Sequence, residues 1–175
     1  MNMPPKLTFC SLEKKDINDI VSAFKANGWN KTKDIYEAYL LEKSNNQRTI
    51  IVAKEDGKFC GYVTIKWKSD YSSFEQQSIP EIADLNVLPS YQKKGIGTQL
   101  IRACEKMASE RGLTNIGIGV GMTADYGNAQ RLYVQLGYVT DGQGLHCQNL
   151  PVSYGYKVLV DDDLVIYLIK LIDGK

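Results

Sequence analysis

The chain has 175 residues, a length that suits one globular domain with a continuous core, and we expect a single domain over residues 1–175. Its 21 basic and 20 acidic residues leave a formal net charge of +1, which argues against a surface built to bind nucleic acid. No run approaches the roughly 20 apolar residues that cross a bilayer, and the first residues lack the apolar stretch of a signal peptide. We therefore expect a cytoplasmic protein with no membrane or nucleic-acid partner.

Cysteine and histidine are too scattered to predict a metal site. Cys10, Cys60, Cys104 and Cys147 form no C-x-x-C pair, and His146 is the sole histidine. We expect reduced, mostly packed thiols. A Cys/His catalytic pair is not predicted either, because adjacent residues of an extended chain point to opposite sides, and His146 is expected in a loop.

The N-terminal part of the chain predicts one strand and two helices. A short strand is expected at Leu7–Cys10. A helix capped near Ser11 follows over Glu13–Ala26, where apolar residues recur at helical spacing. Thr32 is expected to cap a second helix that runs to Leu41.

Three strands are predicted next. Arg48–Glu55 and Lys58–Lys66 are rich in β-branched and aromatic residues and are joined by Asp56-Gly57, a pair that favours a tight hairpin turn. Ile79–Leu88 predicts a fourth strand.

The C-terminal part predicts two more helices and three strands. Helices are expected over Gly95–Glu110, with Gly112 just past the end, and over Gly127–Leu136. Further strands are expected at Asn115–Val120, from Tyr138 to Thr140 and at Leu164–Leu171. This order predicts an α/β fold with a mixed, mostly antiparallel sheet flanked by helices.

A glycine-bearing turn, YQKKGIGT from Tyr91 to Thr98, leads from the fourth strand into a helix. Such a turn offers unpaired backbone N–H groups at the positive end of the helix dipole, which predicts an anion site. Lys93 and Lys94 add cations suited to phosphate. The alternative is an ordinary turn with solvated lysines. A Walker A loop is absent from the sequence, and the Rossmann pattern lacks its third glycine because residue 100 is leucine.

Two spaced motifs carry a resemblance to a known family. The segment LNVLPSYQKKGIGTQLI contains the pattern Q/R-x-x-G-x-G/A, and A-x-x-L-Y-x-x-L-G-Y follows from Ala129 to Tyr138. Together they resemble the GNAT superfamily of N-acetyltransferases, over most of the chain except residues 141–157. The resemblance implies the GNAT acyl-CoA N-acyltransferase fold, an N-acetyltransferase activity, acetyl-CoA as acyl donor and no metal.

The resemblance also implies where the donor binds. The backbone of Leu85 and Val87 would pair with the pantetheine arm, in a gap between the fourth and fifth strands, and Asn128 would bond the same arm. Asn128 has an alternative role as a helix cap. The backbone amides that would cradle the diphosphate belong to Gln92, Lys93, Lys94, Gly95, Ile96, Gly97 and Thr98.

Acyl transfer to an ammonium group needs a base, and the departing thiolate benefits from an acid. The resemblance favours Glu81 as the base, because members of the family commonly have a glutamate near the start of this strand that acts as a base, often through water. Asp84 is the second candidate. In a regular strand the two point to opposite faces, so both reach one cleft only if a bulge intervenes. The resemblance offers Tyr133 as the acid. Each has a structural alternative: an ion pair for the carboxylates and a core position for the tyrosine.

The fifth strand carries Gly117, Gly119 and Gly121 on one face. A face without side chains leaves room for a close neighbour, although tight packing under a helix is the competing interpretation.

The acceptor is predicted only as an amine, on a small molecule or a peptide. By the resemblance its side of the site would lie in Asn27–Lys33 and in a long loop from Asp141 to Tyr156. Two other functions remain open, a noncatalytic acyl-CoA-binding or sensing module and a nucleotide-binding regulator. The oligomeric state, monomer or homodimer, is also left open.

Overall fold

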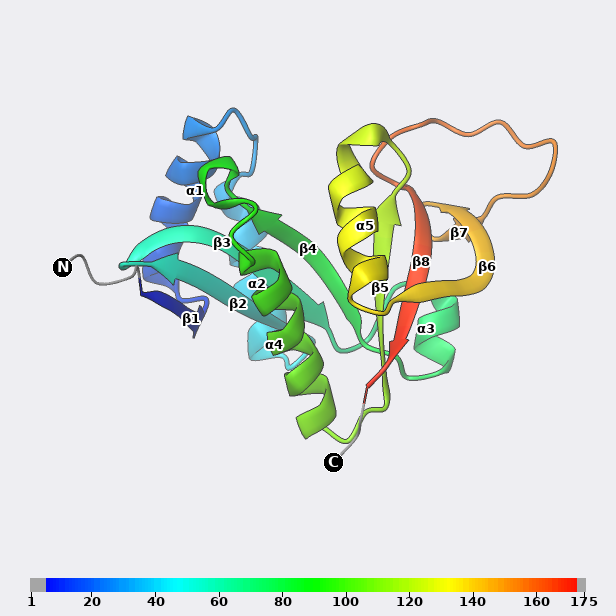
Figure 1. Cartoon of the computed structure of the whole chain (residues 1–175), viewed down its shortest axis with the longest axis horizontal. Helices are drawn as coiled ribbons and strands as arrows, with labels where there is room; N and C mark the ends of the chain where they lie inside the picture. Colours follow the sequence, from blue (N-terminus) through cyan, green and yellow to red (C-terminus); the bar gives the residue numbers. More distant parts are fainter. Residues whose placement is uncertain (1–5, 173–175) are drawn as a thin grey trace. The chain divides into compact units, whose positions relative to one another are not determined.

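The computed structural model describes residues 6–172, which fall into two compact units (Figure 1). The first comprises the described part of Met1–Trp67 together with Asp84–Cys104. The second comprises Lys68–Ala83 and the described part of Glu105–Lys175. Strand β4 (Glu81–Val87) and helix α4 (Ile96–Glu110) each contribute residues to both units. A single domain over 1–175 stays a prediction.

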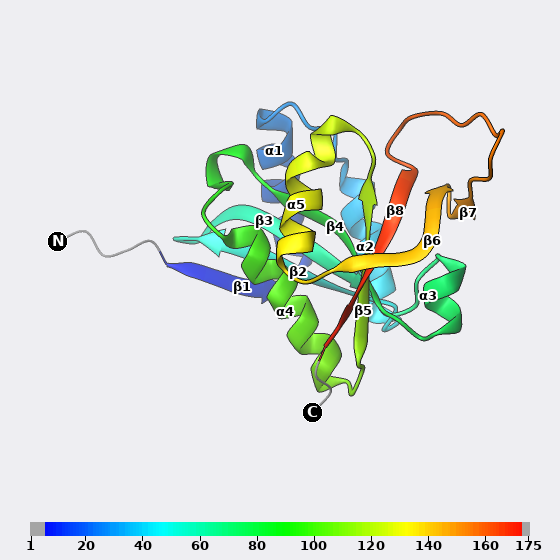
Figure 2. The ribbon, with the colours of Figure 1, turned by 45° about the vertical axis from the view of Figure 1, so that its right-hand side comes forward.

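The first unit is an antiparallel sheet covered by helices. Strands β1 (Leu7–Ser11), β2 (Arg48–Glu55) and β3 (Lys58–Lys66) pair in this order, and the later part of β4 continues it. Figures 1 and 2 show α1 (Ile17–Ala26) and α2 (Lys33–Ser44) on one side of β2 and β3, and the amino-terminal part of α4 on the other. Short 3₁₀ turns precede α1 (η1, Lys14–Asp16) and α4 (η2, Pro89–Tyr91).

The core of the first unit lies under α1 and α2, because both helices turn apolar faces toward the sheet. Phe24 of α1 packs against the rings of Phe59 and Tyr62 of β3, with centroid separations of 5.5 and 5.8 Å. Tyr36 of α2 adds an edge-on contact with Tyr62 at 5.7 Å. Removing these large rings from water is the main stabilising contribution of this face.

The second unit is a sheet in which one pairing is parallel. The first residues of β4 pair in parallel with β5 (Asn115–Gly121), as Glu81 with Gly117 and Ile82 with Ile118. The order continues antiparallel through β8 (Leu164–Leu171), β6 (Val139–Cys147) and β7 (Leu150–Pro151). The helical elements of this unit are α3 (Ser72–Gln76), η3 (Ala124–Tyr126) and α5 (Gly127–Gln135). The predicted mixed, mostly antiparallel sheet with flanking helices is confirmed.

The glycine face of β5 is occupied by aromatic rings from its own unit. A Cβ at Gly117 would overlap the ring of Phe74 from α3, and one at Gly121 would overlap the ring of Tyr126. At Gly119 the Cβ would lie 3.0 Å from the ring of Tyr167. Glycine is therefore needed here because rings approach the strand backbone closely.

Replacing Gly117 by alanine should destabilise the fold by on the order of 1–3 kcal/mol, because the added methyl group meets a buried ring that has little room to move. Urea unfolding monitored by circular dichroism measures the change. Gly127→Ala is the matched control, since a Cβ at this first residue of α5 meets no atom within 4 Å. The control should be neutral or slightly stabilising, and equal losses in the two variants would contradict the argument.

Several boundaries and one loop differ from the sequence prediction. Ser11 ends β1, and Glu13, with Asp16, forms the capping box before α1. Helix α3 was not predicted, because five residues are too few for helical periodicity to appear. The long loop expected from Asp141 is largely wrong. Strand β6 continues to Cys147, its pairing with β8 interrupted between Thr140 and Leu145.

His146 was expected in a loop, which is wrong. It lies on β6 and is only 4% exposed, with its ring edge against Tyr71 at a centroid distance of 4.8 Å. None of the helices among residues 6–172 has the length and apolar character needed to span a bilayer.

Candidate active site

The residues predicted to hold the diphosphate form one turn of the first unit, between β4 and α4. After η2 the chain passes through two left-handed residues, Lys93 (φ 61°) and Gly95 (φ 79°), before α4 begins at Ile96. A Cβ at Gly95 would meet no atom within 4 Å. Glycine suits this position because of its backbone conformation rather than because of crowding.

The turn presents the amino end of a long helix to solvent. The Gln99 N–H donates to the Gly95 carbonyl at 3.1 Å, which sets the first turn of α4. The N–H groups before Gln99 therefore have no acceptor within the helix, and they stand at the positive end of its dipole. Ile96 anchors the helix start in the core at 2% exposure, whereas Lys93 and Lys94 are exposed. The backbone and charge of this turn fit a phosphate-bearing ligand.

Side chains hold the turn against neighbouring strands. The Gln92 amide Nε2 donates to the carbonyl of Val87 at 2.9 Å. Lys94 Nζ lies 3.6 Å from Glu55 Oε2 and 4.9 Å from the centroid of the Tyr91 ring. Because Lys94 is bound loosely and remains exposed, its ammonium group can turn toward an anion at small cost.

Strand β4 approaches β3 unusually closely at its end. A Cβ at Gly61 of β3 would lie 2.6 Å from the carbonyl oxygen of Asn86 and 3.2 Å from the Cα of Val87. Both of these are backbone atoms, so a side chain at Gly61 would push β4 away from β3. Leu85 and Val87, the residues predicted to pair with pantetheine, are half-buried on this part of β4.

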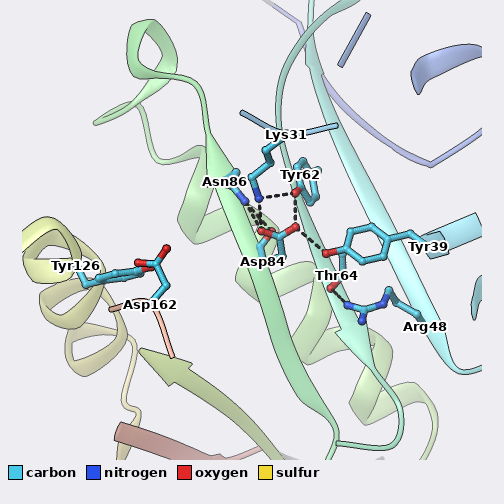
Figure 3. Close-up of polar contacts among 9 residues, drawn as sticks. All are labelled: Lys31, Tyr39, Arg48, Tyr62, Thr64, Asp84, Asn86, Tyr126 and Asp162. Atoms are coloured by element: carbon cyan, nitrogen blue, oxygen red, sulfur yellow. Dashed lines mark hydrogen bonds and ion pairs between the residues drawn. The ribbon is translucent and has the colours of Figure 1, made fainter. Parts of the chain in front are cut away.

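Asp84 interrupts the regular course of β4 with a left-handed backbone of φ 51°. Its carboxylate is the centre of a group of polar side chains within the first unit, which we call the Asp84 cluster (Figure 3). The other members are Lys31, Tyr39, Tyr62 and Asn86.

Each of the two carboxylate oxygens of Asp84 accepts two hydrogen bonds. Oδ1 accepts from Lys31 Nζ at 2.5 Å and from Asn86 Nδ2 at 2.8 Å. Oδ2 accepts from Tyr39 Oη at 2.8 Å and from the Tyr62 hydroxyl. Burial by itself would raise the pKa of the Asp84 carboxyl, but the charge of Lys31 and these donors together hold that pKa below its ordinary value.

Glu81 belongs to the second unit, where β4 pairs with β5. Its Oε2 accepts a hydrogen bond from Ser69 Oγ at 2.5 Å, and Ser69 Oγ in turn accepts from the Tyr71 N–H at 3.0 Å. Ser69 is only 2% exposed, whereas Glu81 is half-buried. The carboxylate is thus oriented by a buried hydroxyl and keeps partial access to solvent.

Tyr133 lies on α5, also in the second unit, and is 6% exposed. Its ring is 6.2 Å from that of Tyr138. Burial, with a smaller contribution from Tyr126, raises the pKa of the Tyr133 hydroxyl to about 12. Asn128 is exposed on the first turn of α5; the cap residue of that helix is Tyr126, so the alternative role of Asn128 as a cap is wrong.

The sequence analysis missed the partners of both candidate bases. Lys31, Tyr39 and Tyr62 hold Asp84, and Ser69 holds Glu81. One signal was present: a tyrosine and a threonine, Tyr62 and Thr64, occupy alternate positions of a strand otherwise rich in apolar residues. Polar groups in a buried strand need partners, but the pattern does not identify them.

Comparisons with known proteins agree with the motifs. The model of the acetyltransferase (GNAT) family matches residues 14–138. YhfO of Bacillus subtilis (strain 168), described as an uncharacterized N-acetyltransferase, is 30% identical over 121 residues, covering 67% of this chain and 77% of YhfO.

Solved structures share the fold. The ribosomal-protein-S18-alanine N-acetyltransferase of Escherichia coli superposes with a TM-score of 0.68 at 16% identity, covering 95% of this chain and 94% of that one. The putative acetyltransferase yncA of Salmonella typhimurium, solved with acetyl-CoA, superposes with a TM-score of 0.67 at 18% identity, covering 97% and 95% of the two chains. Likeness at such low identity establishes the fold alone.

Proposed function

Because the chain belongs to the acetyltransferase (GNAT) family and is therefore an acetyl-CoA-dependent N-acetyltransferase, we propose that a primary amine attacks the thioester directly, with Glu81 as base and Tyr133 as acid. Acetyl-CoA supplies an activated acetyl group and a thiolate leaving group. No residue of the chain is acylated in this scheme.

The observation that carries the proposal is the turn at the amino end of α4. Backbone N–H groups from Gln92 to Thr98 would hold the diphosphate, and the exposed Lys93 and Lys94 would add charge. The backbone of Leu85 and Val87 would pair with the pantetheine arm like an added strand, and Asn128 would bond it from α5.

Glu81 would accept the proton of the acceptor amine. An alkylammonium group has a pKa near ~10.4 and attacks only after losing a proton. Ser69 fixes one carboxylate oxygen of Glu81 and thereby orients the carboxylate that would receive the proton, directly or through water. This support is geometric, because a base needs a fixed position before its basicity matters.

Tyr133 would donate a proton to the departing sulfur. Since its pKa is raised to about 12, the hydroxyl keeps its proton throughout the neutral range. Burial on α5 also holds the Tyr133 ring in place, which restricts where its hydroxyl proton can be delivered.

An amine panel tests the proposal. Thiol release from acetyl-CoA should accelerate with at least one amine among polyamines, amino acids, aminoglycosides and peptides with N-terminal alanine. Mass spectrometry of the product should show one added acetyl group on nitrogen. Tight binding of acetyl-CoA without release by any amine would favour the noncatalytic binding module instead.

Replacing Gly95 by valine should weaken acetyl-CoA binding about tenfold or more. A β-branched residue adopts the left-handed conformation at a cost of roughly 1–2 kcal/mol, so the turn and its N–H groups shift. Isothermal titration calorimetry measures the dissociation constant. Gly112→Val is the control, because Gly112 is also left-handed (φ 75°) with open space around it but lies just past the carboxyl end of α4, away from the turn. Equal affinities for wild type and Gly95→Val would contradict the diphosphate cradle.

A cytoplasmic location, an acceptor that is a small molecule or a peptide, and a homodimer stay predictions within this proposal.

A further inference from the structure

Asp84 adopts a backbone conformation that is unusual within a β-strand. Its φ of 51° lies in the left-handed region, inside a strand whose other residues are extended. Aspartate tolerates this region better than most residues, yet a left-handed residue within a strand persists only where surrounding contacts impose it.

The contacts that impose it come from four segments of the first unit. Lys31 reaches Asp84 from the connection between α1 and α2, Tyr39 from α2, and Tyr62 from β3. Asn86 closes the ring from β4 itself, since its Nδ2 also donates to the Asp84 carbonyl at 3.1 Å (Figure 3). Every direction in which the carboxylate can accept a hydrogen bond is therefore used.

The donors are themselves held in place. Arg48 stacks over the Tyr39 ring at 4.3 Å and donates to Thr64 Oγ1 at 2.7 Å. Lys31 Nζ donates to Tyr62 Oη at 3.0 Å and lies 5.5 Å from the centroid of the same ring. A carboxylate surrounded by fixed donors is an anchor with no free lone pair to receive a substrate proton.

We infer that Asp84 is a positioning residue: the Asp84 cluster holds the left-handed residue of β4, and thereby orients the backbone of Leu85–Val87 and ties the α1–α2 connection to it. The inference rests on the proposed function, which places that backbone against pantetheine. It replaces the earlier view of Asp84 as a second candidate base. The α1–α2 connection is the segment that the sequence analysis assigned to the acceptor side, so one carboxylate would align both reactants.

Three substitutions at Asp84 separate positioning from proton transfer. Asn keeps an oxygen for Lys31 and Asn86, its NH₂ can donate to the tyrosine hydroxyls, and it tolerates the left-handed conformation. Gly keeps the conformation without any side-chain contact. Ala keeps neither. None of the three replacement residues can serve as a base.

We expect Asp84→Ala to weaken acetyl-CoA binding about tenfold or more in calorimetry, as loss of several hydrogen bonds to a charged group implies. Asp84→Gly should fall between Ala and wild type, and Asp84→Asn should stay within about threefold of wild type in kcat and in affinity. Amide hydrogen exchange of Leu85–Val87 in the ligand-free protein should rise in the same order, from Asn through Gly to Ala.

Asp56→Ala is the matched control. Asp56 has nearly the same φ, 50°, in the turn between β2 and β3. Within residues 6–172, its carboxylate accepts a hydrogen bond only from the backbone N–H of Lys6. Hydrogen exchange at Leu85–Val87 should not change in this variant. If Asp84→Ala does not fold, Lys31→Met and Tyr39→Phe can be used instead, because each removes one hydrogen-bond donor to the Asp84 carboxylate. Both should raise amide hydrogen exchange at Leu85–Val87. Lys33→Met is the control for Lys31→Met.

The outcomes are distinguishable. Unchanged exchange and affinity in Asp84→Ala would overturn the inference. A loss of kcat in Asp84→Asn as large as in Asp84→Ala, with acetyl-CoA affinity retained, would identify Asp84 as a base and also overturn it. If wild type binds no acetyl-CoA, the proposed function fails, and the exchange measurements alone decide whether the Asp84 cluster holds β4.

Discussion

Tyr133→Phe should lower kcat by on the order of 10²-fold, because the thiolate would have to leave without its proton donor. The affinity for acetyl-CoA should change by less than about threefold, since the buried ring keeps its packing. Stopped-flow or continuous thiol release with the best amine of the panel gives kcat, and calorimetry gives the dissociation constant. The pH dependence adds a check: with a pKa raised to about 12, Tyr133 should contribute no loss of activity up to about pH 10.

Tyr138→Phe is the control for this prediction. Tyr138 is buried beside Tyr133, and its hydroxyl donates to Glu105 Oε1 at 3.0 Å. Its loss should cost about 1 kcal/mol of stability without a comparable fall in kcat. Turnover by Tyr133→Phe at the wild-type rate would remove the tyrosine from the mechanism and leave it as a core residue.

Glu81→Gln should lower kcat by on the order of 10²- to 10³-fold, because an amide cannot take the ammonium proton. The substitution preserves size, and the amide oxygen can still accept from Ser69 Oγ, so acetyl-CoA affinity should be retained. The profile of kcat/KM against pH should also change in shape, since it reports the ionisations of the free enzyme together with that of the free amine. Initial rates from about pH 6 to 10 measure both effects.

Glu75→Gln serves as the control, since Glu75 is an exposed glutamate of α3 whose carboxylate pairs with Lys68 at 2.8 Å. Its rates should match wild type. If Glu81→Gln keeps the wild-type profile, the proton leaves by another route. Asp84 would be a poor substitute, because a pKa held below the ordinary value makes its carboxylate a weaker base and its lone pairs already accept hydrogen bonds.

The parts of the fold that local sequence determines were predicted accurately. The hairpin of β2 and β3 was predicted with its boundaries, because Asp56-Gly57 specifies a tight turn and both strands are rich in strand-forming residues. Helix α4 and the turn before it were found because an apolar stripe and flanking glycines act within a few residues. The candidate diphosphate site follows from those same local features.

The tertiary structure alone decided how the candidate bases are held and what lies over β5. Lys31 and Tyr39 reach Asp84 across 53 and 45 residues of sequence, so no local pattern links them. The left-handed backbone at Asp84 and the rings over Gly117 and Gly121 have the same origin. Periodicity and turn residues report energies of neighbouring residues, whereas these features depend on which distant side chains the packed chain brings together.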